Sequence, residues 1–385
     1  MKTNKILVLV PTPPPFSGPE VANGLLLETK AFVEGNIIHI NSNVRKSNKD
    51  KGKADLKGVF FSLLLIGKVF NSLVFQRPTH FYLLLSSSRV GFIRDSIYLL
   101  LAKFVFRKKT IAHYRGSNFD GFFHSQNKGL KKYVLFIINK IDRMIIQGKA
   151  IGPSFKGLYP KEKTCVVYNG IKSKPEISRK DRDNISLLFM GNLFYPKGFY
   201  ELINAYKALH TKYGNNIRLL LAGEQIKNPA IALEFLKGDD KHFYRKNHTR
   251  IQDEIDDFLA KTDEYQIEYY GPLQGEEKDK FFQKADIFVL PSYTEGFSMA
   301  CLEAMAWGLP VVVTPVGALS EVIVPELNGL HTPIGNHEKL AENIDKLISS
   351  PELREKMSKQ NSLEVRNKFE IEHIGEVLYK AIITT

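Results

Sequence analysis

Two carboxylates in the second half of the chain, Glu295 and Glu303, flank a pattern that suits a bound phosphate. A buried strand is expected to end at Pro291, and Ser298 is a favourable N-cap for the helix that follows. The first amides of that helix lack intrahelical partners, and with the helix dipole they form an anion site. Glu303 would lie about one helical pitch away. Because carboxylates beside a phosphate are useful as acceptors for hydroxyl groups, the pattern predicts a ligand such as a sugar nucleotide, which carries hydroxyls on both sides of its diphosphate.

A second loop, Met190–Gly198, directly follows another expected strand and contains a cation that could meet a phosphate. It superficially suggests a P-loop. A Walker sequence, however, ends in Gly-Lys-Ser/Thr, and here Lys197 precedes Gly198. Taken alone, Lys197 could equally be a turn lysine on a basic protein.

The first half of the chain contains fewer such signals. His113 and Arg115 directly follow an expected strand, at the edge where parallel sheets bind ligands. Lone histidines are more often structural, so His113 is a candidate that needs support from its surroundings. Gly18 follows the first strand in a proline-rich loop, where Pro19 removes one amide donor.

Short runs of β-branched and aromatic residues alternate with helix-length segments through both halves. Strands this apolar, separated by helices, indicate parallel sheets that are covered on both faces. The expected strands are Ile6–Val10, Ile37–Ile40, Phe81–Leu85, Thr110–His113, Met144–Ile146 and Cys165–Tyr168, followed by Leu187–Met190, Arg218–Leu221, Ile267–Tyr270, Ile287–Leu290 and Val311–Val313. The sequence therefore predicts an α/β fold with two Rossmann-like domains that face each other across a cleft.

The strand pattern pauses at Lys172–Asn184, a polar stretch without hydrophobic period that indicates an interdomain linker. The predicted domains are an N-terminal domain over residues 1–171 and a C-terminal domain over residues 185–368. The last segment, residues 369–385, is expected to form a helix that packs back on the first domain. A charged stretch, Gln225–Glu264, is expected to be a helical insertion in the second domain.

The composition of the 385 residues, 43% hydrophobic and 25% charged, is that of an ordinary globular protein. The two cysteines, Cys165 and Cys301, lie in apolar runs and are expected to be buried thiols in a reducing compartment. The apolar run Ile6–Val10 is too short for a signal peptide and is followed by prolines. No stretch reaches the roughly 18 apolar residues that a membrane span needs.

Charge is distributed unevenly along the chain. Residues 1–170 contain 27 Lys and Arg against 9 Asp and Glu, which gives a net charge of +18. Since the net charge of the whole chain is +13, residues 171–385 have a net charge of −5. The basic half also contains apolar stretches at Val59–Phe75, Arg89–Lys109 and Lys128–Arg143. Anionic leaflets attract basic surfaces by up to ~1 kcal/mol per nearby Lys or Arg, and apolar faces can insert. These features predict attachment to an anionic membrane surface; core helices with snorkelling ends are the alternative.

The segment Ile287–Thr314 resembles the Glu-x7-Glu signature of family-4 retaining glycosyltransferases, the glycosyl transferases group 1 of the GT-B fold. The resemblance covers nearly the whole chain. It implies that Glu303 holds the nucleotide ribose and that Glu295 contacts hydroxyls of the donor sugar. The amides that follow Gly296 would bind the distal phosphate, namely those of Phe297, Ser298 and Met299.

The same resemblance assigns roles in the other loops. Lys197 matches a lysine that contacts the diphosphate, and Asn192 stands where the family usually has an arginine. Gly223 closes a strand where the backbone approaches the base or packs on a helix. Gly18 stands where the family usually has two adjacent glycines against the donor phosphate, the second being proline here. A histidine at the place of His113 lies beside the reacting sugar in similar enzymes.

The resemblance thus implies a retaining glycosyltransferase with His113, Glu295 and Lys197 as its catalytic residues. It would move a sugar from a nucleotide-diphosphate sugar to a glycan or lipid-linked acceptor, in the biosynthesis of cell-surface polysaccharide or lipopolysaccharide. In a front-face route, the departing diphosphate helps to deprotonate the acceptor, and Lys197 and the helix amides stabilise its charge. No metal or other cofactor is expected, and a UDP-sugar is favoured over a GDP-sugar. The expected location is the cytoplasmic face of the cell membrane.

Three other functions compete with this hypothesis. A sugar-nucleotide epimerase shares the two-domain fold but would need acid and base residues in the cleft. A glycogen-type polymerase or phosphorylase differs in the size of its product. A non-enzymatic polyanion-binding protein would explain the basic half alone. The interleaved basic and aromatic pattern of nucleic-acid modules is absent from the sequence, so no nucleic-acid partner is expected.

Overall fold

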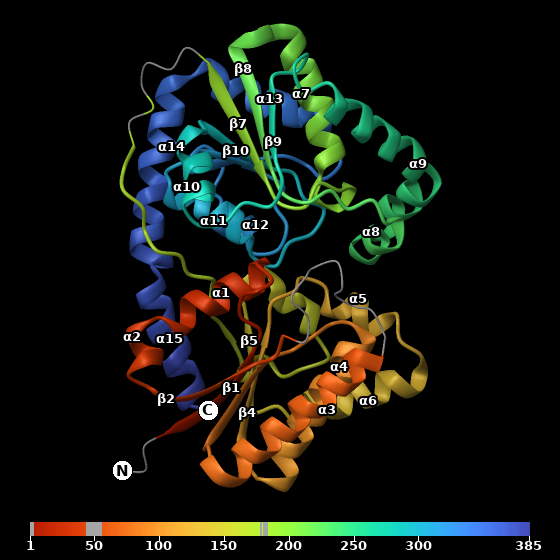
Figure 1. The fold of residues 1–385 in the computed structure, drawn as a ribbon, viewed down its shortest axis with the longest axis vertical. Helices are drawn as coiled ribbons and strands as arrows, with labels where there is room; N and C mark the ends of the chain where they lie inside the picture. The colour runs from red at the N-terminus through yellow and green to blue at the C-terminus, as the bar shows by residue number, and fades with distance from the viewer. Residues whose placement is uncertain (1–3, 44–55, 178, 180–183) are drawn as a thin grey trace. The chain divides into compact units, whose positions relative to one another are not determined.

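A computed structural model of the chain describes residues 4–43, 56–177, 179 and 184–385. The described residues form two compact units. The first comprises those in 1–172 together with 368–385, and the second comprises those in 173–367. Each unit is built on its own parallel sheet with helices packed against it (Figure 1).

The first unit contains a six-stranded parallel sheet in the order β2-β1-β3-β4-β5-β6. Side chains alternate between its two faces, and both faces are buried, which explains the unbroken apolar runs in its strands. The strands are β1 (Lys5–Val10), β2 (Asn36–Asn41), β3 (His80–Leu84), β4 (Lys109–Tyr114), β5 (Arg143–Ile146) and β6 (Thr164–Val166).

Helices from both ends of the chain cover the first sheet. Ile6, Val8 and Val10 pack on one face against α15, while Leu7 and Leu9 pack on the other against α3 and α4. The helices are α1 (Gly18–Leu27), α2 (Lys30–Val33), α3 (Leu56–Asn71), α4 (Arg89–Leu100), α5 (Phe119–His124), α6 (Lys128–Ile138) and α15 (Ile371–Ile383), with shorter turns η2 (Ser72–Gln76), η3 (Leu101–Val105), η4 (Lys149–Phe155) and η5 (Lys161–Lys163). None of the described helices is both long enough and apolar enough to cross a membrane.

The second unit contains another six-stranded parallel sheet, in the order β12-β11-β10-β7-β8-β9. The chain runs outward from β7 to β9 and then returns to place β10 on the other side of β7. The strands are β7 (Ile185–Met190), β8 (Ile217–Ala222), β9 (Ile267–Tyr270), β10 (Ile287–Leu290), β11 (Val311–Val313) and β12 (Gly329–His331). In open α/β sheets, ligands bind at the carboxyl ends of strands at such a switch in strand order, which here lies between β7 and β10.

The helices of the second unit are α7 (Phe199–Tyr213), α8 (Pro229–Phe235), α9 (Gly238–Ala260), α10 (Gly275–Lys284), α11 (Met299–Ala306), α12 (Leu319–Val322), α13 (His337–Ser349) and α14 (Pro351–Glu364). Short turns complete it: η6 (Tyr195–Lys197), η7 (Gly214–Asn216) and η8 (Val365–Phe369). The charged stretch Gln225–Glu264 forms α8 and α9, as its helical pattern predicts.

The predicted α/β fold is confirmed, and every expected strand forms with ends that differ by a few residues. The strand β12 was not predicted, because three residues that begin with Gly329 are too few to show a periodicity. Cys165 is only half-buried, which corrects the expectation of two buried thiols, since its strand lies at the sheet edge. Part of the expected linker, residues 178 and 180–183, lies outside the described residues.

Candidate active site

Two loops meet at the switch point of the second sheet, one after β7 and one after β10. Gly198 has a φ of 71°, and a Cβ at this position would collide with the carbonyl group of Pro291. The amide of Tyr293 donates a hydrogen bond of 2.9 Å to the carbonyl oxygen of Pro196. Glycine is therefore required where the first loop passes the end of β10, and the side chains of both loops converge.

Glu295 is held inside this junction by three elements. Its carboxylate is only 8% exposed and forms an ion pair with the ammonium of Lys197 from the loop after β7. The hydroxyl of Ser292 donates to Oε1 of Glu295 at 2.8 Å. Behind the loop, Gly317 has a φ of 53°, and a Cβ there would collide with the carbonyl oxygens of Glu295 and Gly296. The carboxylate and the lysine that the sequence singles out separately are thus brought into direct contact.

The helix α11 begins where the sequence predicts. The Ser298 hydroxyl accepts a hydrogen bond of 3.3 Å from the amide of Cys301, which makes Ser298 the N-cap. The helix ends before Gly308, whose φ of 66° suits a C-terminal glycine. Phe297 and Met299 are buried on either side of the cap, so the helix start is fixed by apolar packing as well.

Glu303 lies in the second turn of α11 and is 9% exposed. Lys278, from α10, donates a hydrogen bond of 2.6 Å to its Oε1. The same ammonium contacts Oε2, but Oε2 accepts no aligned hydrogen bond from the described residues. A buried carboxylate oxygen in this state can accept a hydrogen bond from a ligand hydroxyl.

Lys278 was missed from the sequence. It stands in the run Glu276-Glu277-Lys278-Asp279-Lys280, where nothing distinguishes it from neighbouring surface charges. Only the packing of α10 beside α11 reveals its role, because the two helices are distant in sequence. Gly317 escaped notice for the same reason, whereas Ser292 lies only three residues before Glu295 and is a loop serine that no pattern distinguishes.

The other residues predicted for nucleotide binding occupy different positions. Asn192 is exposed at the end of β7. Gly223, with a φ of 148°, ends β8, and a Cβ there would collide with the carbonyl of Gly191, so its glycine serves close packing between two strand ends. The carbonyl of Gly296 accepts a hydrogen bond from Ala318. Gly18 begins α1 in the first unit.

His113 belongs to the first unit, where it is buried at the end of β4. Its Nδ1 lies 2.7 Å from the hydroxyl of Tyr82, and its Nε2 has no hydrogen-bond partner among the described residues. Burial, helped by the charge of Arg115, holds the pKa of His113 well below its usual value. The imidazole is therefore neutral near pH 7, and it could donate or accept a hydrogen bond without carrying a charge.

These features define an α/β protein of two Rossmann-like units with buried lysine–carboxylate pairs at a sheet switch point. The family model for glycosyl transferases group 1 matches residues 171–363, half of the chain, and the chain belongs to this family. The match covers nearly the same residues as the second unit and includes the site residues of that unit, Lys197, Glu295 and Glu303 among them.

Individual relatives are more distant. The chain is 28% identical to an uncharacterized glycosyltransferase of Methanocaldococcus jannaschii over 233 residues, which covers 56% of this chain and 53% of the relative. It is 26% identical to the capsular polysaccharide biosynthesis glycosyltransferase CapM of Staphylococcus aureus, with 65% of each chain covered. The chain thus spans between about half and two thirds of the length of these relatives.

Solved structures agree on the fold. The crystal structure of Anabaena HepE with UDP and glucose matches 99% of this chain and 100% of its own, with a TM-score of 0.68 at 15% identity. At this identity the likeness establishes the GT-B architecture of two Rossmann-like units.

Proposed function

We propose that the protein transfers a sugar from a nucleotide-diphosphate sugar to a glycan or lipid-linked acceptor. The observation that carries this proposal is the pair of ion pairs at the β7/β10 switch point, Lys197 with Glu295 and Lys278 with Glu303. A sugar nucleotide presents hydroxyls to carboxylates and phosphate oxygens to ammonium groups, so it satisfies both members of each pair.

The proposed contacts follow from the elements that carry each group. Glu303 accepts hydrogen bonds from the ribose, and Glu295 accepts them from hydroxyls of the donor sugar. Lys197, Lys278 and the first amides of α11 face the diphosphate, where positive charge and free N–H groups stabilise the departing phosphate. His113, a neutral imidazole, assists as a hydrogen-bonding group rather than as a cation.

The proposed reaction retains the anomeric configuration and needs no metal ion, because lysines and amides supply the positive potential. We favour a uridine nucleotide, in keeping with the UDP found with HepE. A role in cell-surface polysaccharide synthesis is consistent with the named function of the staphylococcal relative.

Calorimetry with UDP, GDP and ADP tests the donor proposal, followed by NMR of products formed from the sugars of the best-binding nucleotide. We expect one nucleoside diphosphate to bind, an α-linked product from an α-linked donor, and no loss of rate with a chelator. Failure of every nucleotide to bind would overturn the proposal. Conversion of the donor to an epimer, without transfer, would assign the epimerase activity instead.

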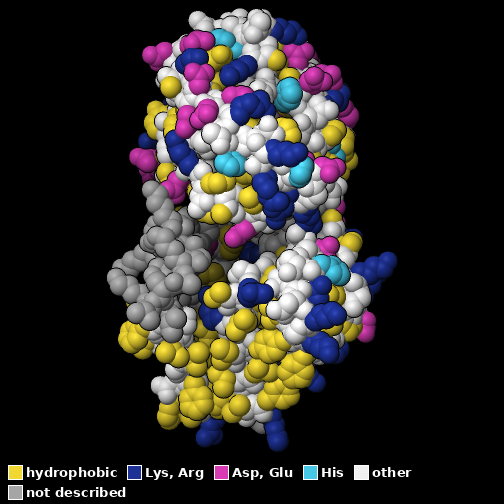
Figure 2. All heavy atoms as spheres, turned by 90° about the vertical axis from the view of Figure 1, so that its right-hand side faces the viewer, with side chains coloured by type: hydrophobic (Ala, Val, Ile, Leu, Met, Phe, Trp, Pro, Cys, Tyr) yellow, Lys and Arg dark blue, Asp and Glu magenta, His cyan; other side chains and the backbone are white. Residues whose placement is uncertain are grey.

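We also propose that the first unit attaches to an anionic membrane surface through its exposed apolar face. Figure 2 shows hydrophobic side chains gathered on this face, with lysines and arginines along its margin. The face is formed by α3, η2, α4, η3 and α6, and its exposed apolar residues are Phe60, Phe61, Leu63, Leu64, Phe70, Phe75, Val90, Ile93, Ile97, Phe104, Val105 and Phe136. Phe75 is 77% exposed and Val90 72%, and so many large apolar side chains together exceed what an ordinary surface carries.

The charges around this apolar face favour an anionic lipid surface as its partner. Lys68, Arg89, Lys132 and Lys140 are exposed around it. The five elements that form it contain a single carboxylate, Asp95, which is buried and paired with Arg94. Basic residues attract anionic headgroups, while aromatic and aliphatic side chains enter the interface.

The structure corrects one part of the predicted basic surface. The helix α6 ends at Ile138, so the expected helical stretch to Arg143 is shorter than predicted. Arg143 begins β5 and donates to the carbonyl oxygen of Ala381 at 2.6 Å, which ties it to α15. It is therefore a structural residue and not part of the membrane face.

A further inference from the structure

The first unit contains a cavity of about 310 Å³ at the switch point of its own sheet. The chain pairs β2 beside β1 and then places β3 on the other side, so the switch lies between β1 and β3. Leu9 and Pro11 from the end of β1, and Ser86 and Ser87 after β3, line the cavity, with Arg115 following β4. This is the position in an open parallel sheet at which ligands bind, and the volume is that of a small-molecule site.

Two side chains in the cavity wall carry buried donors that make no well-aligned hydrogen bond with any described residue. The hydroxyl of Tyr98, a residue that is 1% exposed, has no hydrogen-bond partner among the described residues. Arg115 donates from Nη1 to Asn169 at 2.7 Å, whereas its Nε and Nη2 are buried and make no hydrogen bond within the described part of the chain. Because an unpaired buried donor destabilises the folded protein, such a group in a cavity wall is a candidate to donate to a ligand.

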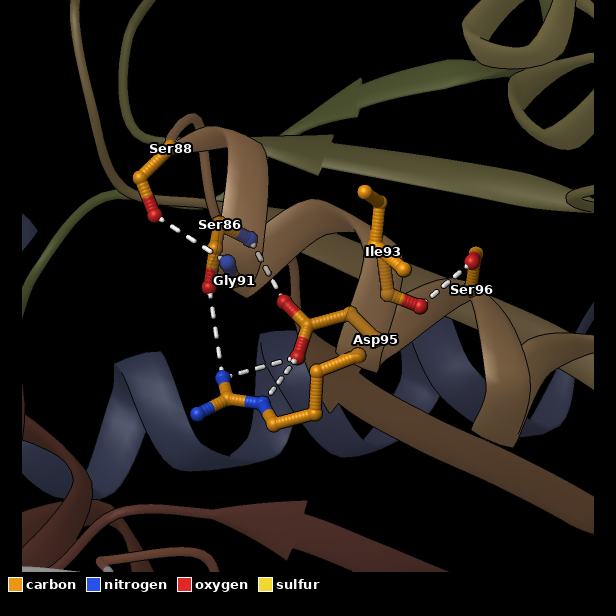
Figure 3. A network of polar contacts seen from close by, with 7 residues as sticks. Ser86, Ser88, Gly91, Ile93, Asp95 and Ser96 are labelled. Carbon is orange, nitrogen blue, oxygen red and sulfur yellow. Dashed lines mark hydrogen bonds and ion pairs between the residues drawn. The ribbon is translucent and has the colours of Figure 1, made fainter. Parts of the chain in front are cut away.

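Arg115 forms no ion pair among the described residues, although Tyr82 and the charge of Glu20 lie near enough to influence it. The other cation in the wall, Arg94, is neutralised by Asp95, to which its Nε and Nη2 donate at 3.0 and 2.8 Å. Asp95 is in turn fixed by the amide of Ser86 at 2.9 Å, a network that Figure 3 shows around Ser86 and Asp95. The wall therefore keeps one net positive charge, that of Arg115.

The surroundings of Arg115 favour an anion as its partner. Burial lowers the pKa of Arg115, and the neighbouring Tyr82 and the charge of Glu20 oppose this effect. Burial also raises the pKa of Tyr98 to about 12, so its hydroxyl keeps its proton and remains a donor. A guanidinium stays charged at any physiological pH, and its planar fork matches the oxygens of a carboxylate or phosphate.

We propose that this cavity binds an oxyanion-bearing sugar, with Arg115 and Tyr98 donating to its carboxylate or phosphate oxygens. This inference rests on the proposed function, since the ligand is the acceptor or the terminal unit of the acceptor. Ser86 and Ser87 offer hydroxyls for the sugar ring, and Leu9 with Leu85 offers apolar contact. The enzyme then selects acceptors by charge, and it discriminates against neutral sugars that leave the guanidinium unpaired.

The test uses the full-length protein and three probes that share a hexose ring: glucose 6-phosphate, glucuronate and glucose. Calorimetry or ligand-observed NMR should show saturable binding of at least one anionic probe and at least tenfold weaker binding of glucose. The preferred anion identifies phosphate or carboxylate as the natural group. Equal affinity for glucose, or no saturable binding of either anion, would overturn the proposal.

Three variants separate recognition from folding. Arg115→Gln should weaken binding of the preferred anion at least tenfold, Arg115→Lys should keep part of it, and Tyr98→Phe should weaken it with the charge intact. UDP affinity serves as the internal control, since the donor residues belong to the other unit. If Arg115→Gln and Tyr98→Phe bind the anion as tightly as the wild type does, the assignment of this cavity is wrong, even if UDP binds. If the wild type binds the anionic probe but not UDP, the donor proposal is wrong and the anion site in this cavity is retained.

Discussion

Ion pairs in the second unit hold the proposed donor-binding carboxylates in place before a ligand arrives. The side chains of Glu295 and Glu303 are 8% and 11% exposed, and those of Lys197 and Lys278 are 27% and 23% exposed. When these contacts are exchanged for a ligand, each carboxylate accepts hydrogen bonds from hydroxyls and each lysine pairs with phosphate, so no charged group is left without a partner. The pairs therefore preorganise the site, and removal of one carboxylate affects binding more directly than folding.

The first prediction concerns Glu303. Glu303→Gln should weaken binding of UDP by about 1–3 kcal/mol, because a charged acceptor for the ribose hydroxyls is replaced by a neutral one. Isothermal titration calorimetry measures this change. Glu338→Gln, on the exposed start of α13, is the matched control and should bind UDP as the wild type does. Equal affinities in the two variants would remove Glu303 from the site.

At the scale of elements, glycines set how closely the loops approach each other. Gly317 and Gly214 both have a φ of 53°, but only Gly317 lies against another backbone segment, the carbonyls of Glu295 and Gly296. A Cβ at Gly214 would meet no atom within 4 Å. The two positions therefore share a positive φ and differ in what a Cβ would meet.

The second prediction uses this matched pair. Gly317→Ala should displace the Glu295 loop and lower the rate of sugar transfer by at least tenfold, whereas Gly214→Ala should change the rate by less than twofold. Both variants should lose stability from the positive φ, on the order of 1 kcal/mol, and Gly317→Ala should lose more because its Cβ also collides with two carbonyl oxygens. Initial rates and thermal unfolding curves of the two variants check this, and equal rates would show that the loop position does not matter.

The third prediction concerns the contact between α7 and the loop after β10. Glu201 is buried, and the Tyr293 hydroxyl donates to its Oε1 at 2.6 Å. Burial raises the pKa of Glu201 from 4.5 to about 7, an effect that the hydrogen bond from Tyr293 partly offsets. Between these two values the folded state keeps a proton that the unfolded chain has lost. The contribution of Glu201 to stability therefore falls as the pH rises through this window, by at most about 1.4 kcal/mol per pH unit.

Glu201→Gln removes this titration and keeps an acceptor for Tyr293. The free energy of unfolding of the variant, measured by urea denaturation between pH 4.5 and 8, should rise relative to the wild type up to about pH 7 and then level off. A difference between variant and wild type that does not change with pH would contradict the raised pKa.

The sequence predicts helices and strands correctly where the residues that determine them lie close together in the chain. The apolar strands and the segment from Ser298 to Gly308 carry caps, periodicity and glycine placement within a few residues. Lys278 and Arg115 illustrate what is not local. Lys278 matters because it pairs with a carboxylate on another helix. The sequence does place Arg115 after a strand, but only the packing around the cavity shows that its buried donors lack aligned partners among the described residues.

At the scale of the whole molecule, the two units differ in charge and in surface. The basic half of the chain supplies the exposed apolar face, and most of the carboxylates lie in the other half. A protein that is basic throughout would have a positive net charge in both halves, whereas residues 171–385 have a net charge of −5. Basic residues beside exposed aromatic side chains instead match the two attractions that hold a peripheral protein at a lipid interface.

The last prediction is that vesicle binding requires both attractions. The protein should co-sediment with vesicles containing anionic phospholipid, bind neutral vesicles at least tenfold more weakly, and be released by salt, because Coulomb attraction between exposed charges is screened. Lys131→Glu, Lys132→Glu and Lys140→Glu combined should abolish binding, since each reversal turns an attraction of up to ~1 kcal/mol into a repulsion. Phe75→Ser with Phe104→Ser should weaken binding at every salt concentration, because it removes inserted apolar area. The matched control changes the net charge equally on the second unit, by Lys237→Glu with Lys356→Glu and Lys359→Glu, and it should bind vesicles as the wild type does. If the control loses as much vesicle binding as the triple variant of the first unit, or if the wild type binds neutral and anionic vesicles equally, this face does not bind the membrane.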